Sequence, residues 1–210
     1  MESVFIRMNS AAYLDIAHVV LPATKFISIG VSSLSRGDPS GLPAINRILE
    51  NARGSETLEM RIMDSELRVV PESITCTTLA HLLISAPTSV DTMLEFIKVL
   101  PNLVMMMLND LDLSDIRTDM SVPDADDESI SEPLHTSLRT LTLDYDRERH
   151  SPDTAVTVVK CVLLRIPTLE KLCASQVPVR PVASFIKAHM PRYPHLSSVE
   201  LILDEDGEST

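Results

Sequence analysis

A short frame of apolar residues recurs along the chain, and this repetition constrains the fold more than any other feature. In its clearest copy, leucines occupy the first, fourth and sixth positions of the frame, at Leu138, Leu141 and Leu143. Because alternate side chains of a strand point to the same face, each copy predicts a short strand with one buried face. Copies begin near residues 24, 57, 79, 103, 138, 169 and 196, which predicts about seven irregular repeats.

Prolines stand at a fixed place before several of these frames. Pro101, Pro167 and Pro194 each lie two residues ahead of a leading leucine. Because proline lacks the backbone N–H and cannot continue a helix, it predicts a helix that ends just before the frame. Apolar residues at helical spacing support this prediction, most clearly over 90–100 and 155–166. Shorter stripes of the same kind occur over 13–21, 45–49 and 182–186.

Repeats of a strand, a turn and a helix predict an α/β fold built as a solenoid. A single unit cannot bury its apolar faces alone. Stacked units bury a continuous core between a curved parallel sheet on the concave side and helices on the convex side. A compact α/β domain that merely alternates strands and helices is the competing prediction. The repeats are predicted to form a single domain over residues 1–203.

From about Thr24 to Leu203 the pattern resembles the leucine-rich repeat, in which the L-x-x-L-x-L frame is followed by asparagine or cysteine at the ninth position. No copy in this chain carries that asparagine or cysteine. The degenerate repeats with long helical inserts are most similar to fungal proteins of the F-box/leucine-rich-repeat type. That resemblance implies a ubiquitin-ligase adaptor as a partner. The 23 residues before the first frame, however, predict one helix and no recognisable F-box.

Negative charge is concentrated outside the predicted strands and helices. The formal net charge is −12, and residues 115–132 and 204–210 together account for ten of these charges. Both stretches are polar, so we predict a solvated acidic loop and an acidic disordered tail.

Residues 133–203, by contrast, carry a net charge of +3, which raises the alternative of weak polyanion or nucleic-acid binding. The acidic segments and the scarcity of aromatic side chains disfavour nucleic acid. The basic residues concerned are Arg147, Arg149, Lys160, Arg165, Lys171, Arg180, Lys187 and Arg192.

Motifs for catalysis, cofactor binding or metal binding do not occur in the sequence. The five glycines are too scattered for the glycine-rich loops that cradle phosphates, and the three cysteines show no C-x-x-C spacing. Cys173 beside Lys171 is considered as a reactive thiol, but no histidine is placed next to it. We therefore predict a non-enzymatic protein with no cofactor and no metal.

The same features predict where the protein resides. No apolar run approaches the roughly 18–20 residues of a membrane span, and the N-terminus lacks a signal-peptide pattern. Because there is also no disulfide framework, we predict an intracellular protein, cytoplasmic or nuclear, with no membrane partner.

The predicted binding surface is the concave face of the sheet together with the loop at 144–150. Residues between the buried frame positions point to this face. Leu83, Met105 and Met107 make its centre apolar, which suits an adaptable protein interface. A strand at 104–108 that is buried on both faces is the alternative explanation for the run of methionines.

We therefore predict a protein–protein interaction module that binds an unidentified protein partner. Within the same class, the alternative is the substrate-recognition component of a ubiquitin ligase. The candidate contact residues are His81, Leu83, Met105, Met107, Thr140, Thr142, Asp144, Tyr145 and Lys171.

Overall fold

The computed structural model describes residues 3–8, 24–31, 54–62, 78–113, 137–145 and 150–202. The predicted acidic loop at 115–132 and the predicted tail at 204–210 lie outside these residues. The helices predicted over 13–21 and 45–49 lie outside them as well.

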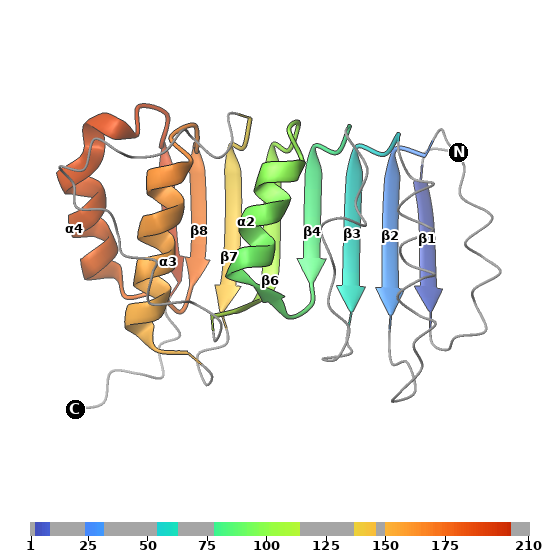
Figure 1. Cartoon of the computed structure of the whole chain (residues 1–210), viewed down its shortest axis with the longest axis horizontal. Coiled ribbons are helices and arrows are strands. Elements are labelled where there is room, and N and C mark those ends of the chain that lie inside the picture. The colour runs from blue at the N-terminus through green and yellow to red at the C-terminus, as the bar shows by residue number, and fades with distance from the viewer. Residues whose placement is uncertain are drawn as a thin grey trace.

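The described residues form one nine-stranded sheet in which neighbouring strands are parallel (Figure 1). Eight strands follow one another across the sheet in chain order, and the short β5 pairs with β6 outside this path. The strands are β1 (Ser3–Met8), β2 (Phe26–Val31), β3 (Thr57–Ile62), β4 (His81–Ser85), β5 (Thr88–Ser89), β6 (Met105–Asp112), β7 (Thr140–Tyr145), β8 (Lys171–Ser175) and β9 (Ser198–Ile202). An α/β fold with a parallel sheet is therefore confirmed.

Helices connect several of these strands. The helices of the described residues are α2 (Val90–Val99), α3 (Pro152–Arg165), α4 (Val179–His189) and the short 3₁₀ helix η3 (Met190–Arg192). Ser89 and Ser151 cap α2 and α3, because each hydroxyl accepts a backbone N–H from the first turn. The helices predicted over 90–100, 155–166 and 182–186 are thus confirmed.

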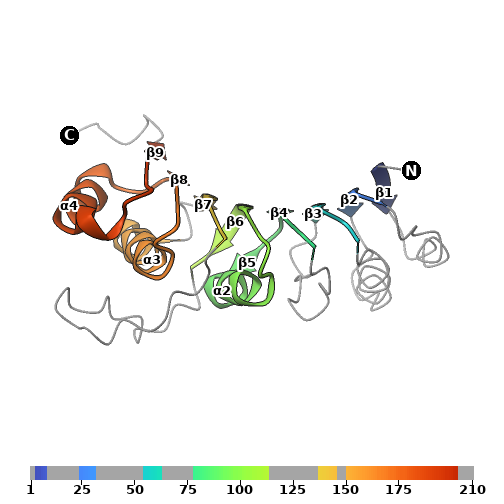
Figure 2. The same ribbon diagram turned by 90° about the horizontal axis from the view of Figure 1, so that it is seen from above.

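The sheet and the helices form two layers. Figure 2 shows the strands as a bowed row, with α2, α3 and α4 on its convex side. Side chains that face the helices form the core, and Leu82, Met106 and Leu141 among them are completely buried. The opposite side of the sheet carries no helix in the described part of the chain, and we call it the open face.

One backbone arrangement recurs at the start of successive strands. The Lys25 carbonyl accepts the N–H groups of Glu56 and Thr57, at 2.9 and 3.0 Å. The carbonyl groups that repeat this double acceptance toward the next strand belong to Glu56, Ala80, Val104, Arg139 and Glu170. Successive members of this series are 31, 24, 24, 35 and 31 residues apart. The same local structure is thus built from unequal lengths of chain.

The positions of these shared carbonyl groups show that the start of one predicted frame was misplaced. The residue before each shared carbonyl is buried, and ahead of β3 that residue is Ser55, so the frame begins at 55 rather than 57. Ser55 is 1% exposed, and its hydroxyl donates to the Thr24 carbonyl at 2.8 Å. The hydrogen bond makes serine suitable at a position where the pattern requires an apolar residue. The two-residue error leaves Leu58 and Met60 on the buried face, because side chains alternate along a strand.

β1 is a strand that the sequence analysis did not predict. Val4 and Ile6 pair with Ile27 and Ile29, so β1 takes the place of a further frame ahead of residue 24. The strand was therefore missed, whereas the helix predicted over 13–21 lies outside the described residues.

Candidate partner-binding face

The register of the strands aligns the side chains of the open face into three rows. The first row runs through Ser3, Phe26, Thr57, His81, Met105, Thr140, Lys171 and Ser198. The second runs through Phe5, Ser28, Glu59, Leu83, Met107, Thr142, Cys173 and Glu200. The third runs through Arg7, Gly30, Arg61, Ser85, Asn109, Asp144, Ser175 and Ile202. Every candidate contact residue except Tyr145 belongs to one of these rows.

Three apolar side chains lie together at the centre of the open face. Leu83, Met105 and Met107 occupy adjacent strands, with Leu83 opposite Met107, and we call them the apolar block. All three are half-buried, whereas Met106 between the two methionines is fully buried on the other face. The alternative of a strand at 104–108 that is buried on both faces is therefore wrong.

Polar side chains flank the apolar block. His81 Nδ1 lies 3.2 Å from Thr57 Oγ1 on the next strand. The predicted frame would have placed Glu59 beside His81, and the register puts Thr57 there instead. On the other side, Thr140 and Thr142 are half-buried next to the methionines. An apolar centre bordered by hydrogen-bonding groups is the distribution typical of protein interfaces.

Charged residues at the far end of the open face have partners within the chain. Lys171 Nζ lies 2.9 Å from Glu200 Oε1. The hydrogen bond that Lys171 donates to Glu200 is the largest cause that raises the pKa of the Lys171 amine, and the negative charge of Glu200 is the next. The Asp144 carboxylate accepts a hydrogen bond from the Ser175 hydroxyl. Lys171 and Asp144 thus lie on the open face as predicted; Lys171 is paired with an opposite charge, and Asp144 accepts a hydrogen bond from a neutral hydroxyl.

Cys173 lies in the same region and is half-buried. Burial is the main cause that raises the pKa of its thiol, and the carboxylates of Glu200 and Asp144 also raise it, while the Lys171 ammonium acts in the opposite direction. A raised pKa reduces the thiolate fraction at neutral pH. The surroundings of Cys173 therefore do not activate it as a nucleophile.

Tyr145 is the candidate contact residue that does not reach the open face. Its side chain is only 5% exposed. β7 extends through Tyr145, and the alternation that turns Asp144 outward turns its neighbour into the core. Burial raises the pKa of the Tyr145 hydroxyl far above its ordinary range, and within the described residues that hydroxyl has no hydrogen-bond partner. The prediction of Tyr145 as a partner contact was wrong.

The structure describes both ends of the loop predicted at 144–150, and His150 is its last residue. Residues 146–149 lie outside the described residues, and the side chain of His150 is buried. His150 Nε2 accepts the Leu113 N–H at 3.2 Å, and Asp112 Oδ1 lies 3.6 Å from the same nitrogen. His150 fastens the end of the loop to the end of β6.

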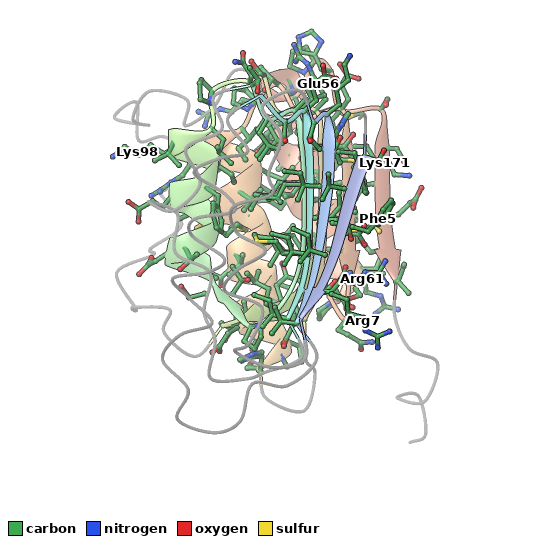
Figure 3. The ribbon with its side chains drawn as sticks, turned by 90° about the vertical axis from the view of Figure 1, so that its right-hand side faces the viewer. Phe5, Arg7, Glu56, Arg61, Lys98 and Lys171 are labelled. Carbon is green, nitrogen blue, oxygen red and sulfur yellow. The ribbon has the colours of Figure 1, made fainter. Side chains whose placement is uncertain are left out.

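The other end of the open face holds residues that were not among the predicted contacts. Phe5 is 73% exposed, and its ring centroid lies 5.4 Å from that of Phe26 on the next strand. Arg7 and Arg61 stand in the third row on either side of Gly30. We call these five residues the Arg–Phe patch. Figure 3 shows Phe5, Arg7 and Arg61 projecting from the side of the sheet away from the helices.

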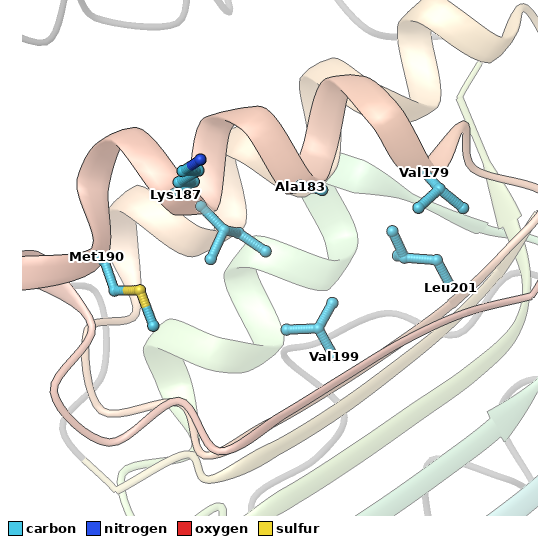
Figure 4. A pocket seen from close by; sticks show the side chains of 7 residues that line it. Val179, Ala183, Lys187, Met190, Val199 and Leu201 are labelled. Atoms are coloured by element: carbon cyan, nitrogen blue, oxygen red, sulfur yellow. The ribbon is translucent and has the colours of Figure 1, made fainter.

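A separate apolar hollow lies in the helical layer, at the end of the sheet formed by β9. It is a cavity of about 420 Å³ between α4 and β9 (Figure 4). Its lining residues are Val179, Ala183, Ile186, Lys187, Met190, Val199 and Leu201. Val182 is the buried residue of α4. The other apolar side chains of this helix, which face the cavity, are therefore only partly covered. None of the predicted contact residues lines this cavity.

The basic residues considered for polyanion binding are spread over both layers. Lys171 lies on the open face, whereas Lys160 and Lys187 belong to helices on the opposite side. Arg147 and Arg149 lie outside the described residues.

Neither a metal site nor a similarity to a known protein assigns a function to the described residues. Within the described residues, His, Cys, Asp and Glu side chains form no group of three or more that could hold a metal ion. No helix in that part of the chain is long and apolar enough for a membrane span. No model of a protein family matches the chain, and a comparison with curated proteins found no match. The geometry of the open face is therefore the basis for assigning a function.

Proposed function

We propose that the chain is a degenerate leucine-rich-repeat-like solenoid of strands and helices. Three features support this proposal: strands in chain order, parallel pairing, and helices on the convex side of a bowed sheet. The repeated strand-start arrangement that begins at Lys25 is a further support, because successive units contact one another through the same backbone groups. The proposed relation to F-box/leucine-rich-repeat proteins depends on the frame of apolar residues alone.

We propose that the open face binds a protein partner and that the protein is not an enzyme. The observation that carries this proposal is the apolar block, where Leu83, Met105 and Met107 stay half-buried at the centre of a face on which the described residues place no helix. The solvated face of a sheet is ordinarily polar, so three adjacent large apolar side chains need another explanation. Methionine side chains adapt to irregular surfaces, which suits a contact surface.

Covering this surface would contribute enough free energy to matter for affinity. Burial of apolar surface contributes about 25 cal/mol per Å². A partner that removes about 100 Å² of it from water would gain about 2.5 kcal/mol, or nearly two powers of ten in the dissociation constant.

Charged substitutions in the apolar block test the proposal. Leu83→Glu and Met105→Glu place a carboxylate at the centre of the proposed interface, on side chains that already reach solvent, so the fold should persist. Val99→Glu is the matched control, because Val99 is 43% exposed on α2 in the other layer. We expect a set of proteins that crosslinks in cell extract to the wild type and to the control, but not to the block variants.

Mass spectrometry of the crosslinked proteins then separates the alternatives. A ubiquitin-ligase adaptor in that set would make the chain a substrate-recognition component. The same proteins recovered with all variants, each shown to be folded by circular dichroism, would reject the open face as the interface.

A further inference from the structure

The Arg–Phe patch contains a cation that no acid of the described residues neutralises. Arg7 is exposed and makes no ion pair with any of them. Arg61 differs, because its Nη2 and Nε both lie 2.6 Å from Glu59 Oε1. That pair holds the Arg61 guanidinium in place and leaves further N–H groups for another acceptor, since arginine has five. The three charges together leave a positive patch on a chain whose net charge is −12.

Gly30 leaves room for the two arginines to bind the same ligand. The register places it between Arg7 and Arg61, and a β-carbon added at Gly30 would lie 3.9 Å from Arg7 Cγ. The stem of Arg7 therefore lies against bare backbone. Two strand spacings put the Cα atoms of the arginines roughly 10 Å apart. Both guanidinium groups can then reach a single anionic group above Gly30, and guanidinium groups form strong charge-assisted hydrogen bonds with carboxylates.

An apolar surface adjoins this anion-binding position on two sides. The exposed ring of Phe5 lies in the neighbouring row on β1, and the half-buried ring of Phe26 packs beside it on β2, two rows from Gly30. Glu59, the ion-pair partner of Arg61, is the register neighbour of Leu83 and lies between the patch and the apolar block. From β1 to β6 the distance is four strand spacings, roughly 19 Å, which an extended peptide of about six residues covers. Arginine and aromatic side chains are also the residue types that dominate binding energy in interfaces.

We propose that the Arg–Phe patch binds a carboxylate side chain of the partner's docking segment, with a neighbouring large apolar side chain packed on Phe5 and Phe26. The segment is extended and continues over the apolar block. This proposal rests on the proposed function of the open face as a protein-binding surface. A short acidic segment fits better than a polyanion, because the net charge of −12 opposes a polyanion over a longer range.

Selection of peptides from a random library displayed on phage, with the full chain immobilised, tests this chemistry. We expect the enriched peptides to combine Asp or Glu with a large apolar residue. Arg7→Glu should weaken binding of an enriched peptide, measured by fluorescence anisotropy, by about tenfold or more. Gly30→Val keeps the charge but adds methyl groups beside the stem of Arg7 and under the proposed carboxylate, so it should weaken binding several-fold. Lys98→Glu is the matched control, because Figure 3 shows Lys98 on the helical side.

The outcomes separate this proposal from the proposed function. Enriched peptides without acidic residues, or acidic peptides that bind Arg7→Glu as tightly as the wild type, would overturn the carboxylate proposal. If those peptides lose binding to Leu83→Glu, the open face remains a protein-binding surface. If Leu83→Glu binds them equally well, or if no peptide is enriched, the proposed function fails as well. Binding of single-stranded polyuridylate that is lost in Arg7→Glu and Phe5→Ala, without any acidic peptide, would assign the patch to nucleic acid instead.

Discussion

The two faces of the sheet should respond very differently to the same substitution. Leu141 is completely buried between Met106 and Leu172 in the inward row, whereas Leu83 is half-buried on the open face. Leu141→Ala removes three carbon groups worth about 0.8 kcal/mol each and leaves a cavity that costs about 1 kcal/mol more. We expect a loss of about 3 kcal/mol in the free energy of unfolding. Leu83→Ala should cost about 1 kcal/mol or less, because solvent can fill the space on the open face.

Differential scanning calorimetry provides the readout, supported by urea unfolding followed by far-UV circular dichroism. The chain contains no tryptophan, so tryptophan fluorescence cannot report the transition. For a protein of this size, each kcal/mol corresponds to a shift in Tm of about 2–4 °C. We therefore expect Leu141→Ala to lower Tm by about 6–12 °C and Leu83→Ala to lower it by no more than about 4 °C.

Equal losses for the two variants would refute the reasoning. Such a result would mean that the open face is packed as tightly as the face under the helices. The comparison requires the same urea m-value in both variants, because a changed m-value signals a change in the denatured state or in cooperativity.

Other residues provide independent tests. Tyr145→Phe removes a buried hydroxyl without a partner among the described residues, so stability in urea at neutral pH should stay equal or rise. Burial raises the folded-state pKa of Tyr145, so wild-type stability should fall as pH rises above the unfolded value of 10.0, and the variant should fall less; equal alkaline losses would contradict this. Ser55→Ala removes the donor to the Thr24 carbonyl and should cost about 1–2 kcal/mol in urea, so a neutral effect would disprove the structural role of that hydrogen bond. Cys173 should react with iodoacetamide more slowly than a free thiol at neutral pH, as followed by mass spectrometry of the labelled peptide, and Glu200→Gln should speed the reaction; a fast wild-type reaction would argue against the raised pKa.

The sequence predicted strands and their buried faces best where every position of the frame was apolar. The copy at Leu138 is apolar at every frame position, and the strand and its buried face follow directly. Ser55 was not recognised as a buried frame position, because its place in the core depends on a hydrogen bond to a residue 31 positions earlier. β1 did carry the signal, since Met1, Val4 and Ile6 fit the frame, and alternation within it would also have placed Phe5 on the open face.

The candidate site was harder to predict than the strands. The apolar block could be found because its residues follow the frame within β4 and β6. Tyr145 was misplaced because the loop was expected to begin one residue before β7 ends. The meeting of Arg7, Gly30 and Arg61 depends on the register of strands joined by connections of unequal length, and no local spacing in the sequence encodes that register.

The order of the strands also bears on how the protein responds to a pulling force. β1 and β9 lie at opposite ends of the row, and each strand on the path is hydrogen-bonded to its neighbours on that path, which runs in chain order. Force applied between the two ends acts along the hydrogen bonds rather than along the strands, so it opens the bonds one pair at a time. We therefore expect the molecule to extend by stepwise peeling at low force, with an outer strand leaving first, instead of resisting until all strands shear together.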